Sequence, residues 1–145
     1  MGQAIERLAK ARNHEIVAKI EAGEKDFKAA AHAEVAIEFT EPSAAVDNIK
    51  RCIDLGIPVI SGTTGWLENF EHIQEYTRSK NGTFFYASNY SIGVNLFFKI
   101  NELVAEMMNN HQEYDVSMEE IHHIHKKDSP SGTGITLAEG ILKHI

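Results

Sequence analysis

Cysteine is nearly absent from this chain, because Cys52 is the only one in 145 residues. A single thiol cannot form an internal disulfide, and it cannot build a zinc site made of cysteines. Cys52 lies on the apolar face of a helix that we expect from Pro42 to about Leu55. We therefore expect this thiol to pack in the core rather than to react.

Basic residues are also scarce, with 14 Lys and Arg against 21 Asp and Glu and a formal net charge of -7. This balance argues against a general nucleic-acid-binding protein, which needs a broad cationic surface. No apolar run approaches the roughly 20 residues of a membrane-spanning helix, and the N-terminus lacks the basic and then apolar layout of a signal peptide. We expect a cytoplasmic protein without a membrane partner.

The chain has no Pro, Gly or Ser-rich linker, no low-complexity tract and no repeat, so its organisation must come from hydrophobic periodicity. Strand-like and helical patterns alternate along the first two thirds. The expected strands are 14–20, 34–39, 57–61 and 83–88, and the expected helices are 2–11, 42–55, 67–79 and 91–110. This alternation predicts an α/β fold with a doubly wound parallel sheet of the Rossmann type.

Ligands of such sheets bind at the carboxyl ends of the strands, which directs attention to the loops after Ile20, Phe39, Ser61 and Ser88. The pattern changes after the long helix. Residues 114–123 are strand-like but more polar, and a helix is expected over 134–145. We expect a first domain at 1–94 and a second, of α+β type, at 95–145, with the long helix as the bridge.

The start of the chain resembles part of a dinucleotide fingerprint. Gly2 opens the first helix, and Glu21 follows the next strand, close to the spacing of roughly 20 residues at which an acidic residue binds the adenosine ribose. The first strand and the earlier glycines of the fingerprint do not precede Gly2. A surface glutamate in a loop remains the alternative for Glu21.

The segment Ser-Gly-Thr-Thr-Gly at 61–65 follows an expected parallel strand. Its small residues allow a ligand to approach the backbone, and its hydroxyls suit an uncharged polar group such as a ribose or a carboxamide. It lacks the lysine of a phosphate-binding loop, which argues against nucleotide triphosphate hydrolysis. An ordinary turn is the alternative.

Three histidines and two lysines gather within the six residues 122–127, just before a helix start at Ser131, Gly132 and Thr133. A metal site would need convergent ligands, and a carboxylate or cysteine to complete it is not evident. A solvated basic loop is a second possibility. The helix start favours a third, because unpaired amides and the helix dipole attract anions. His and Lys side chains beside them would form a pocket for a small carboxylate and could transfer a proton.

The stretch Glu-Ile-His-His-Ile-His-Lys-Lys-Asp-Ser-Pro-Ser-Gly-Thr-Gly at 120–134 resembles the signature of the 4-hydroxy-tetrahydrodipicolinate reductase (dihydrodipicolinate reductase) family, E-x-H-H-x-x-K-x-D-x-P-S-G-T. Three further segments, at 38–42, 58–66 and 87–95, are similar to that family's segments in the family's order. The resemblance extends over essentially the whole chain. It implies an oxidoreductase of diaminopimelate and lysine biosynthesis that reduces its substrate with NADH or NADPH.

The resemblance also implies residue roles. Lys126 would donate the proton that completes reduction, with His122 as its partner, although these two roles could be exchanged. The substrate carboxylates would be bound by His123, Ser131, Gly132 and Thr133. The cofactor would be bound by Gly2, Glu21, Phe39, Thr40, Gly62, Thr63, Thr64, Ala87, Ser88, Asn89 and Tyr90. No metal is expected.

Cofactor preference follows from the surroundings of Glu21. A 2'-phosphate requires a basic residue beside the ribose-binding acid, whereas Ala22 and Gly23 follow Glu21 and the first cation after it is Lys25. We expect NADH to serve at least as well as NADPH.

The family pattern extends beyond both ends of this chain, so we expect the first domain to be incomplete at its N-terminus and the second at its C-terminus. The resemblance further implies a small dicarboxylate substrate and a homotetramer for the full-length enzyme. Two alternatives remain: another nicotinamide-dependent oxidoreductase of a small acid, and a noncatalytic nucleotide-binding or metal-binding module.

Overall fold

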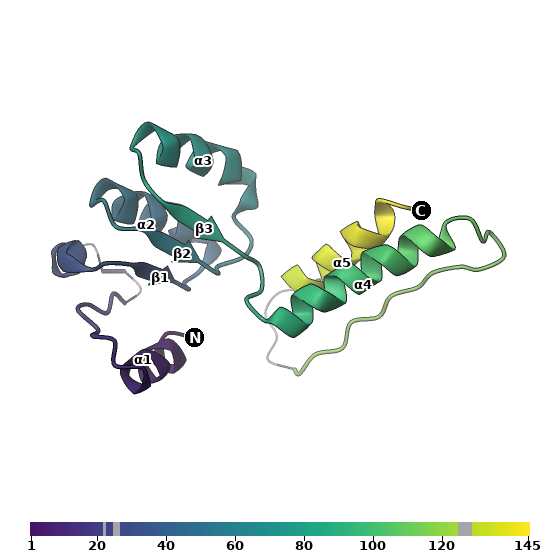
Figure 1. Ribbon diagram of the computed structural model, residues 1–145, viewed down its shortest axis with the longest axis horizontal. Coiled ribbons are helices and arrows are strands. Elements are labelled where there is room, and N and C mark those ends of the chain that lie inside the picture. The colour runs from purple at the N-terminus through teal and green to yellow at the C-terminus, as the bar shows by residue number, and fades with distance from the viewer. Residues whose placement is uncertain (22, 25–26, 125–128) are drawn as a thin grey trace. The chain divides into compact units, whose positions relative to one another are not determined.

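The computed structural model describes residues 1–21, 23–24, 27–124 and 129–145. The chain divides into two compact units, Met1–Ala87 and Ser88–Ile145. The boundary expected after residue 94 stays a prediction. Figure 1 labels the helices and strands of each unit.

Unit 1 contains a parallel sheet of three short strands in the order β1(Ala36–Glu38), β2(Val59–Ser61) and β3(Phe84–Tyr86). The helices α2(Pro42–Asp54) and α3(Phe70–Ser79) make the crossovers and pack against each other (Figure 1). The predicted α/β class and parallel pairing are confirmed. The observed strands are shorter than the sequence predicted, because strand ends need partners for their backbone hydrogen bonds.

The core of unit 1 lies between the sheet and these two helices. Ile49 of α2 and Ile73 of α3 are completely buried, and Val59 of strand β2, which belongs to the same cluster, is 1% exposed. Cys52 is buried in the same cluster, which confirms its packing role. On alternate strand positions, Ile37 and Phe85 are about half exposed, so the opposite sheet face is covered less.

The helix ends follow local signals. Pro42 occupies the first turn of α2, where its missing N–H costs no hydrogen bond. Gly56 follows α2 with φ at 73°, a left-handed conformation that glycine adopts without strain. A short 3₁₀ turn, η2(Leu67–Asn69), leads into α3, so the helix expected from 67 begins as a tighter turn.

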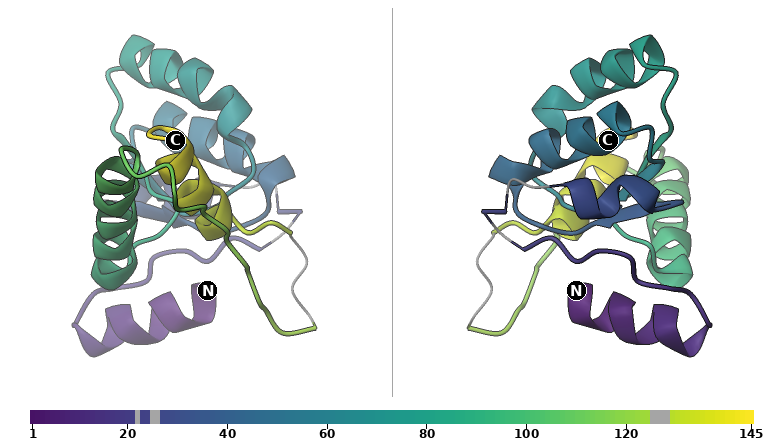
Figure 2. Two further views of the ribbon diagram at one scale, coloured as in Figure 1. Left: turned by 90° about the vertical axis from the view of Figure 1, so that its right-hand side faces the viewer. Right: turned by 90° about the vertical axis from the view of Figure 1, so that its left-hand side faces the viewer.

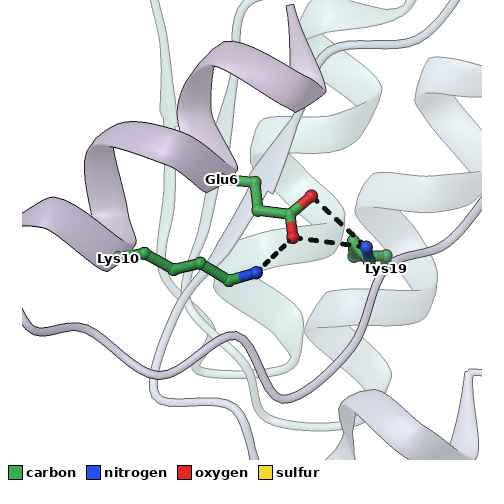
Figure 3. A network of polar contacts seen from close by, with 3 residues as sticks. All are labelled: Glu6, Lys10 and Lys19. Atoms are coloured by element: carbon green, nitrogen blue, oxygen red, sulfur yellow. Dashed lines mark hydrogen bonds and ion pairs between the residues drawn. The ribbon is translucent and has the colours of Figure 1, made fainter.

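The first helix, α1(Gly2–Ala11), matches its prediction. The strand predicted at 14–20 was wrong, because these residues form neither a strand nor a helix. It is tied to α1 by Glu6, whose carboxylate lies 2.6 Å from Lys10 Nζ and 3.3 Å from Lys19 Nζ (Figure 3). Alternation of apolar and polar residues is typical of strands, but a strand also needs a neighbouring strand to pair with.

Unit 2 consists of α4(Ile92–Met108), a long return segment and α5(Gly132–Leu142). The two helices lie side by side (Figures 1 and 2). Asn101 Nδ2 donates to Leu137 O at 2.9 Å, and Lys143 Nζ donates to Glu102 Oε1 at 2.6 Å. Gly140 allows the close approach, since a Cβ there would lie 3.1 Å from Asn101 Nδ2.

The prediction of a strand-like segment at 114–123 was also wrong, because residues 114–123 form no strand. The helix expected over 134–145 is present as α5, which begins two residues earlier, at Gly132, with Ser131 as its N-cap. Within the part of the chain that the structure describes, no helix is long and apolar enough to cross a membrane.

Candidate functional site

The carboxyl edge of the sheet in unit 1 brings together residues from three strands. Glu38 of β1 is in register with Ser61 of β2, and Ser61 is in register with Tyr86 of β3. Ala87 extends this edge, because its backbone N–H donates to Ser61 O at 3.3 Å. This is the edge where parallel α/β sheets bind their ligands.

Glu38 is the centre of a hydrogen-bond network at this edge. It is only 6% exposed, although it carries a carboxylate. Ser61 Oγ donates to Glu38 Oε2 at 2.5 Å, and Thr63 Oγ1 donates to Oε1 at 2.8 Å. Thr40 donates twice to Oε1, from its hydroxyl and from its backbone N–H, the latter at 3.1 Å. Several good hydrogen bonds are what a buried carboxylate requires.

The network joins the two loops that follow β1 and β2. Thr40 N also donates to Thr63 Oγ1 at 2.8 Å, and Gly62 N donates to Glu38 O at 3.0 Å. The structure therefore brings together four of the predicted cofactor-binding residues: Phe39, Thr40, Gly62 and Thr63. A site made of hydroxyls and small residues suits an uncharged polar group, such as the carboxamide or ribose of a dinucleotide.

Gly62 is required by the close approach of an aromatic ring. A Cβ at this position would lie 2.1 Å from Phe39 Cε1, well inside contact distance. Any larger residue would therefore force the Phe39 ring to move.

Trp66 anchors the far end of the loop. It is 2% exposed, and its Nε1 donates to Thr63 O at 2.6 Å. Its ring packs edge-on against Tyr86 at a centroid distance of 5.4 Å and also contacts Phe70 and Phe84. The segment 61–65 is therefore fixed at both ends. Glu38 contacts its first residues, and the aromatic cluster around Trp66 follows its last one.

Glu38 also affects the thiol beneath the sheet. Burial raises the pKa of Cys52 to about 11, and the charge of Glu38 adds to the shift. At neutral pH the group is therefore a protonated thiol, which is a poor nucleophile.

In unit 2, the start of α5 holds a carboxylate of the chain itself. Ser131 N donates to Glu120 Oε2 at 3.0 Å, and His122 Nδ1 lies 3.3 Å from Glu120 Oε1. The missing side chain of Gly134 makes room, since a Cβ there would lie 2.9 Å from Glu120 Oε2. One carboxylate therefore connects the helix start with a predicted catalytic histidine.

This arrangement corrects one expectation about the helix start. The sequence predicted unpaired groups at Ser131, yet its amide donates to Glu120 and its hydroxyl accepts from Gly134 N at 3.0 Å. The physical reason is general: a helix start attracts whichever anion is near, and Glu120 supplies one.

Several predicted site residues lie away from the sheet edge of unit 1 or outside the described residues. Gly2 opens α1, and Glu21 is exposed in a turn where Glu24 N donates to Glu21 O. Asn89 Oδ1 accepts from Ser91 N at 2.8 Å, just before α4. The predicted proton donor, Lys126, lies outside the described residues, as do His125 and Lys127. The structure also describes six further predicted residues, whose roles stay predictions: Thr64, Ser88, Tyr90, His123, Gly132 and Thr133.

Sequence reasoning missed three residues that the structure places among the predicted ones: Glu38, Ser61 and Glu120. A signal existed for two of them. Glu38 is an acidic residue at the end of an otherwise apolar strand, and Glu120 is the first residue of the E-x-H-H pattern. Ser61 was included in the loop but was given no role.

Metal binding can be judged only for part of the histidine-rich stretch. Among the residues that the structure describes, no three or more His, Cys, Asp or Glu residues are grouped to hold a metal ion. Since His125 is not among them, the expectation of no metal stays a prediction.

The fold and the polar edge define unit 1 as a Rossmann-like dinucleotide-binding domain. Comparison with known families identifies it further. Residues 1–90 match the family described as "Dihydrodipicolinate reductase, N-terminus", and residues 93–145 match "Dihydrodipicolinate reductase, C-terminus". The chain belongs to the dihydrodipicolinate reductase family.

Individual relatives carry a consistent name. The chain is 47% identical over 148 residues to a 4-hydroxy-tetrahydrodipicolinate reductase of Christiangramia forsetii, an alignment that covers 99% of this chain and 60% of that protein. Similar proteins of the same name occur in Methanococcus maripaludis, with 39% identity over 78% of this chain and 41% of the relative, and in Chromobacterium violaceum, with 38% identity over 80% and 43%. The chain thus spans less than two thirds of the length of these relatives.

Proposed function

We propose that this chain belongs to an enzyme that reduces 4-hydroxy-tetrahydrodipicolinate to tetrahydrodipicolinate with a reduced nicotinamide dinucleotide, in diaminopimelate and lysine biosynthesis. The observation that carries the proposal is that both halves of the family match in order, over residues 1–90 and 93–145. The relatives' shared name supports the same activity.

The cofactor half of the proposal rests on the sheet edge of unit 1. Thr40, Gly62 and Thr63 are held together there by Glu38. We assign the nicotinamide end of the cofactor to this edge, with Phe39 beside it and Thr64 and Ala87 to Tyr90 completing the site. Gly2 and Glu21 would bind the adenosine end. When bound, the cofactor supplies the hydride.

The substrate half rests on the segment around α5. His123, Ser131, Gly132 and Thr133 would bind the substrate carboxylates, and Lys126 or His122 would donate the proton that balances the transferred hydride. Glu120 supports this assignment for His122, because its carboxylate lies 3.3 Å from the Nδ1 atom and can orient the ring.

The choice of cofactor is a finer part of the proposal. Gly23 follows Glu21 closely, and basic side chains are lacking among residues 21–24. NADH should therefore serve at least as well as NADPH, because a 2'-phosphate gains from a basic partner. The proposal also includes a small dicarboxylate as substrate and a homotetramer as the assembled enzyme.

The activity can be tested with the polypeptide expressed from the complete reading frame that encodes this chain. NADH and NADPH absorbance is followed with enzymatically generated 4-hydroxy-tetrahydrodipicolinate, for the parent and for Lys126→Ala. We expect rapid oxidation by the parent and a fall of roughly 10²-fold to 10⁴-fold in the variant, the usual contribution of a general acid. Cofactor affinity, measured by calorimetry, should not change.

Two outcomes would contradict the proposal. Absence of substrate-dependent oxidation by the parent would remove the reductase function and leave a dinucleotide-binding protein. A clear preference for NADPH in paired assays would overturn the cofactor assignment alone.

A further inference from the structure

Glu38 does something that the proposed function leaves unexplained. It places a carboxylate inside the sheet edge, with 6% of the residue exposed, where an apolar side chain would be cheaper to bury. The four hydrogen bonds described above all come from neutral groups: three hydroxyls and one backbone N–H. The negative charge is therefore solvated by hydroxyls rather than cancelled by them.

The direction of these hydrogen bonds restricts what the hydroxyls can do. A carboxylate only accepts, and each hydroxyl has one hydrogen to donate. Thr40, Ser61 and Thr63 each direct that hydrogen to Glu38. Toward any other partner these three oxygens can act only as acceptors, as Thr63 Oγ1 already does for Thr40 N at 2.8 Å.

Of these three residues, Thr40 is the most accessible to a ligand at the sheet edge. Ser61 is fully buried and Thr63 is 5% exposed, whereas Thr40 is only partly buried. From the residues that the structure describes, its hydroxyl accepts a long contact of 3.4 Å from Asn48 Nδ2, so it retains capacity to accept from a ligand. A ligand group beside Thr40 would meet an acceptor oxygen with a negative charge behind it.

We propose that Glu38 is a positioning residue that makes this edge selective for a hydrogen-bond donor, so that the carboxamide of a nicotinamide ring is accepted and the carboxylate of a nicotinic acid ring is rejected. The inference rests on the proposed function, because it takes the nicotinamide end of the cofactor to lie at this edge. A carboxamide has an NH₂ group that can donate to Thr40, whereas a carboxylate has no hydrogen to donate and is repelled by Glu38.

The test compares three ligands that share the same adenosine half: NADH, its deamido analogue with a nicotinic acid ring, and ADP-ribose, which has no ring. Binding to the polypeptide from the complete reading frame is measured by calorimetry. We expect the wild type to bind NADH roughly 100-fold more tightly than the deamido analogue, the scale that follows from leaving a polar group of the site without its hydrogen-bond partner.

The variant Glu38→Gln keeps the shape of the side chain and removes its charge. The NH₂ group of the glutamine would donate to a neighbouring hydroxyl oxygen. That hydroxyl could then direct its own hydrogen toward a ligand. We expect the preference for NADH to shrink to about tenfold or less, because both the charge and the fixed donor direction are lost. Affinity for ADP-ribose should stay the same, which a general loss of structure would not allow.

Matched controls separate this effect from net charge and from folding. Glu41→Gln removes one charge three residues away, from an exposed side chain that makes no capping hydrogen bond with α2, and should retain the full preference. Thr40→Val should lose the preference as Glu38→Gln does, and Thr40→Ser should keep it. These two variants also provide the test if Glu38→Gln does not fold.

The outcomes are distinguishable. Equal binding of NADH and the deamido analogue by the wild type would overturn the inference while leaving the proposed function intact. An undiminished preference in Glu38→Gln or Thr40→Val would also overturn it. A wild type that binds none of the three ligands would overturn the proposed function, and the inference with it.

Discussion

Glu38 in unit 1 and Glu120 in unit 2 are both carboxylates placed among predicted ligand-binding residues, but they are held differently. Glu38 is 6% exposed and accepts hydrogen bonds from three residues, Thr40, Ser61 and Thr63. The Glu120 side chain is 23% exposed and connects Ser131 N with the His122 ring. The first is enclosed by its donors, whereas the second lies at the more exposed start of a helix.

The comparison shows how one residue type serves two purposes. A buried carboxylate with several donors fixes the geometry of its neighbours, since moving it would leave those donors unpaired. A partly exposed carboxylate at a helix start is exchangeable, because water or another anion can replace it.

Removing the aromatic anchor of unit 1 should have the largest effect on stability. Trp66→Ala deletes a side chain that is 2% exposed and packs against three aromatic rings. We expect unit 1 to lose about 3–5 kcal/mol of stability, the usual cost for a buried Trp. Urea denaturation followed by the aromatic circular dichroism would measure it.

Trp66→Phe is the matched variant. It retains a ring but loses the hydrogen bond to Thr63 O. Its loss should be clearly smaller than that of Trp66→Ala. Equal losses would mean that the hydrogen bond, rather than ring packing, holds the loop.

The two carboxylates can be compared directly by truncation. Glu38→Ala leaves the hydroxyls of Ser61 and Thr63 without their acceptor in a buried place. The expected cost is about 1–3 kcal/mol for each unsatisfied buried group. Glu120→Ala should cost only about 1 kcal/mol, as loss of a helix cap does.

Hydrogen exchange measured by mass spectrometry would localise these effects. Faster exchange should be confined to the loops after β1 and β2 in Glu38→Ala, and to the start of α5 in Glu120→Ala. If Glu120→Ala proved the more damaging change, the distinction between a fixed and an exchangeable carboxylate would be wrong.

The smallest expected effect concerns Cys52 and alkaline pH. Burial and, secondarily, the charge of Glu38 raise the pKa of this thiol to about 11, above its ordinary value of 9.0. The native chain should therefore react slowly with iodoacetamide at neutral pH and rapidly once unfolded. Because the folded pKa is the higher one, this contribution to stability is complete below pH 9 and declines as the pH rises from about 9 through 11.

Glu38→Gln provides the corresponding control, as it removes the secondary cause of the shift. It should increase the alkylation rate of the folded chain modestly. Rapid alkylation of the wild-type chain at neutral pH would contradict the assigned burial of Cys52.

Much of the fold was predictable because helices carry local signals. The extent of α1, the start of α2 at Pro42 and its end near Gly56 follow from periodicity and capping residues. The segments 14–20 and 114–123 were predicted as strands and are not, although their alternation is real. A strand depends on a partner that lies elsewhere in the chain, so its own residues cannot guarantee it.

The site was predictable in part for the same reason. Small residues and hydroxyls after β2 indicated a binding loop, and Phe39, Thr40, Gly62 and Thr63 do lie together. Their roles, and those of the other assigned residues, stay predictions. Glu38 was not predicted because its importance comes from contacts with Ser61 and Thr63, which lie 23 and 25 positions further along the chain.

By itself, the sequence determined the α/β class, the alternation of helices with apolar strands and the family signature that ends at Ser131, Gly132 and Thr133. These depend on short-range spacing, which the chain carries wherever it folds. Only the tertiary structure decided that Glu38 gathers the hydroxyls of two loops and that Glu120 reaches the start of α5. A buried charge is stable only where distant donors converge on it, and that convergence is a property of the packed chain.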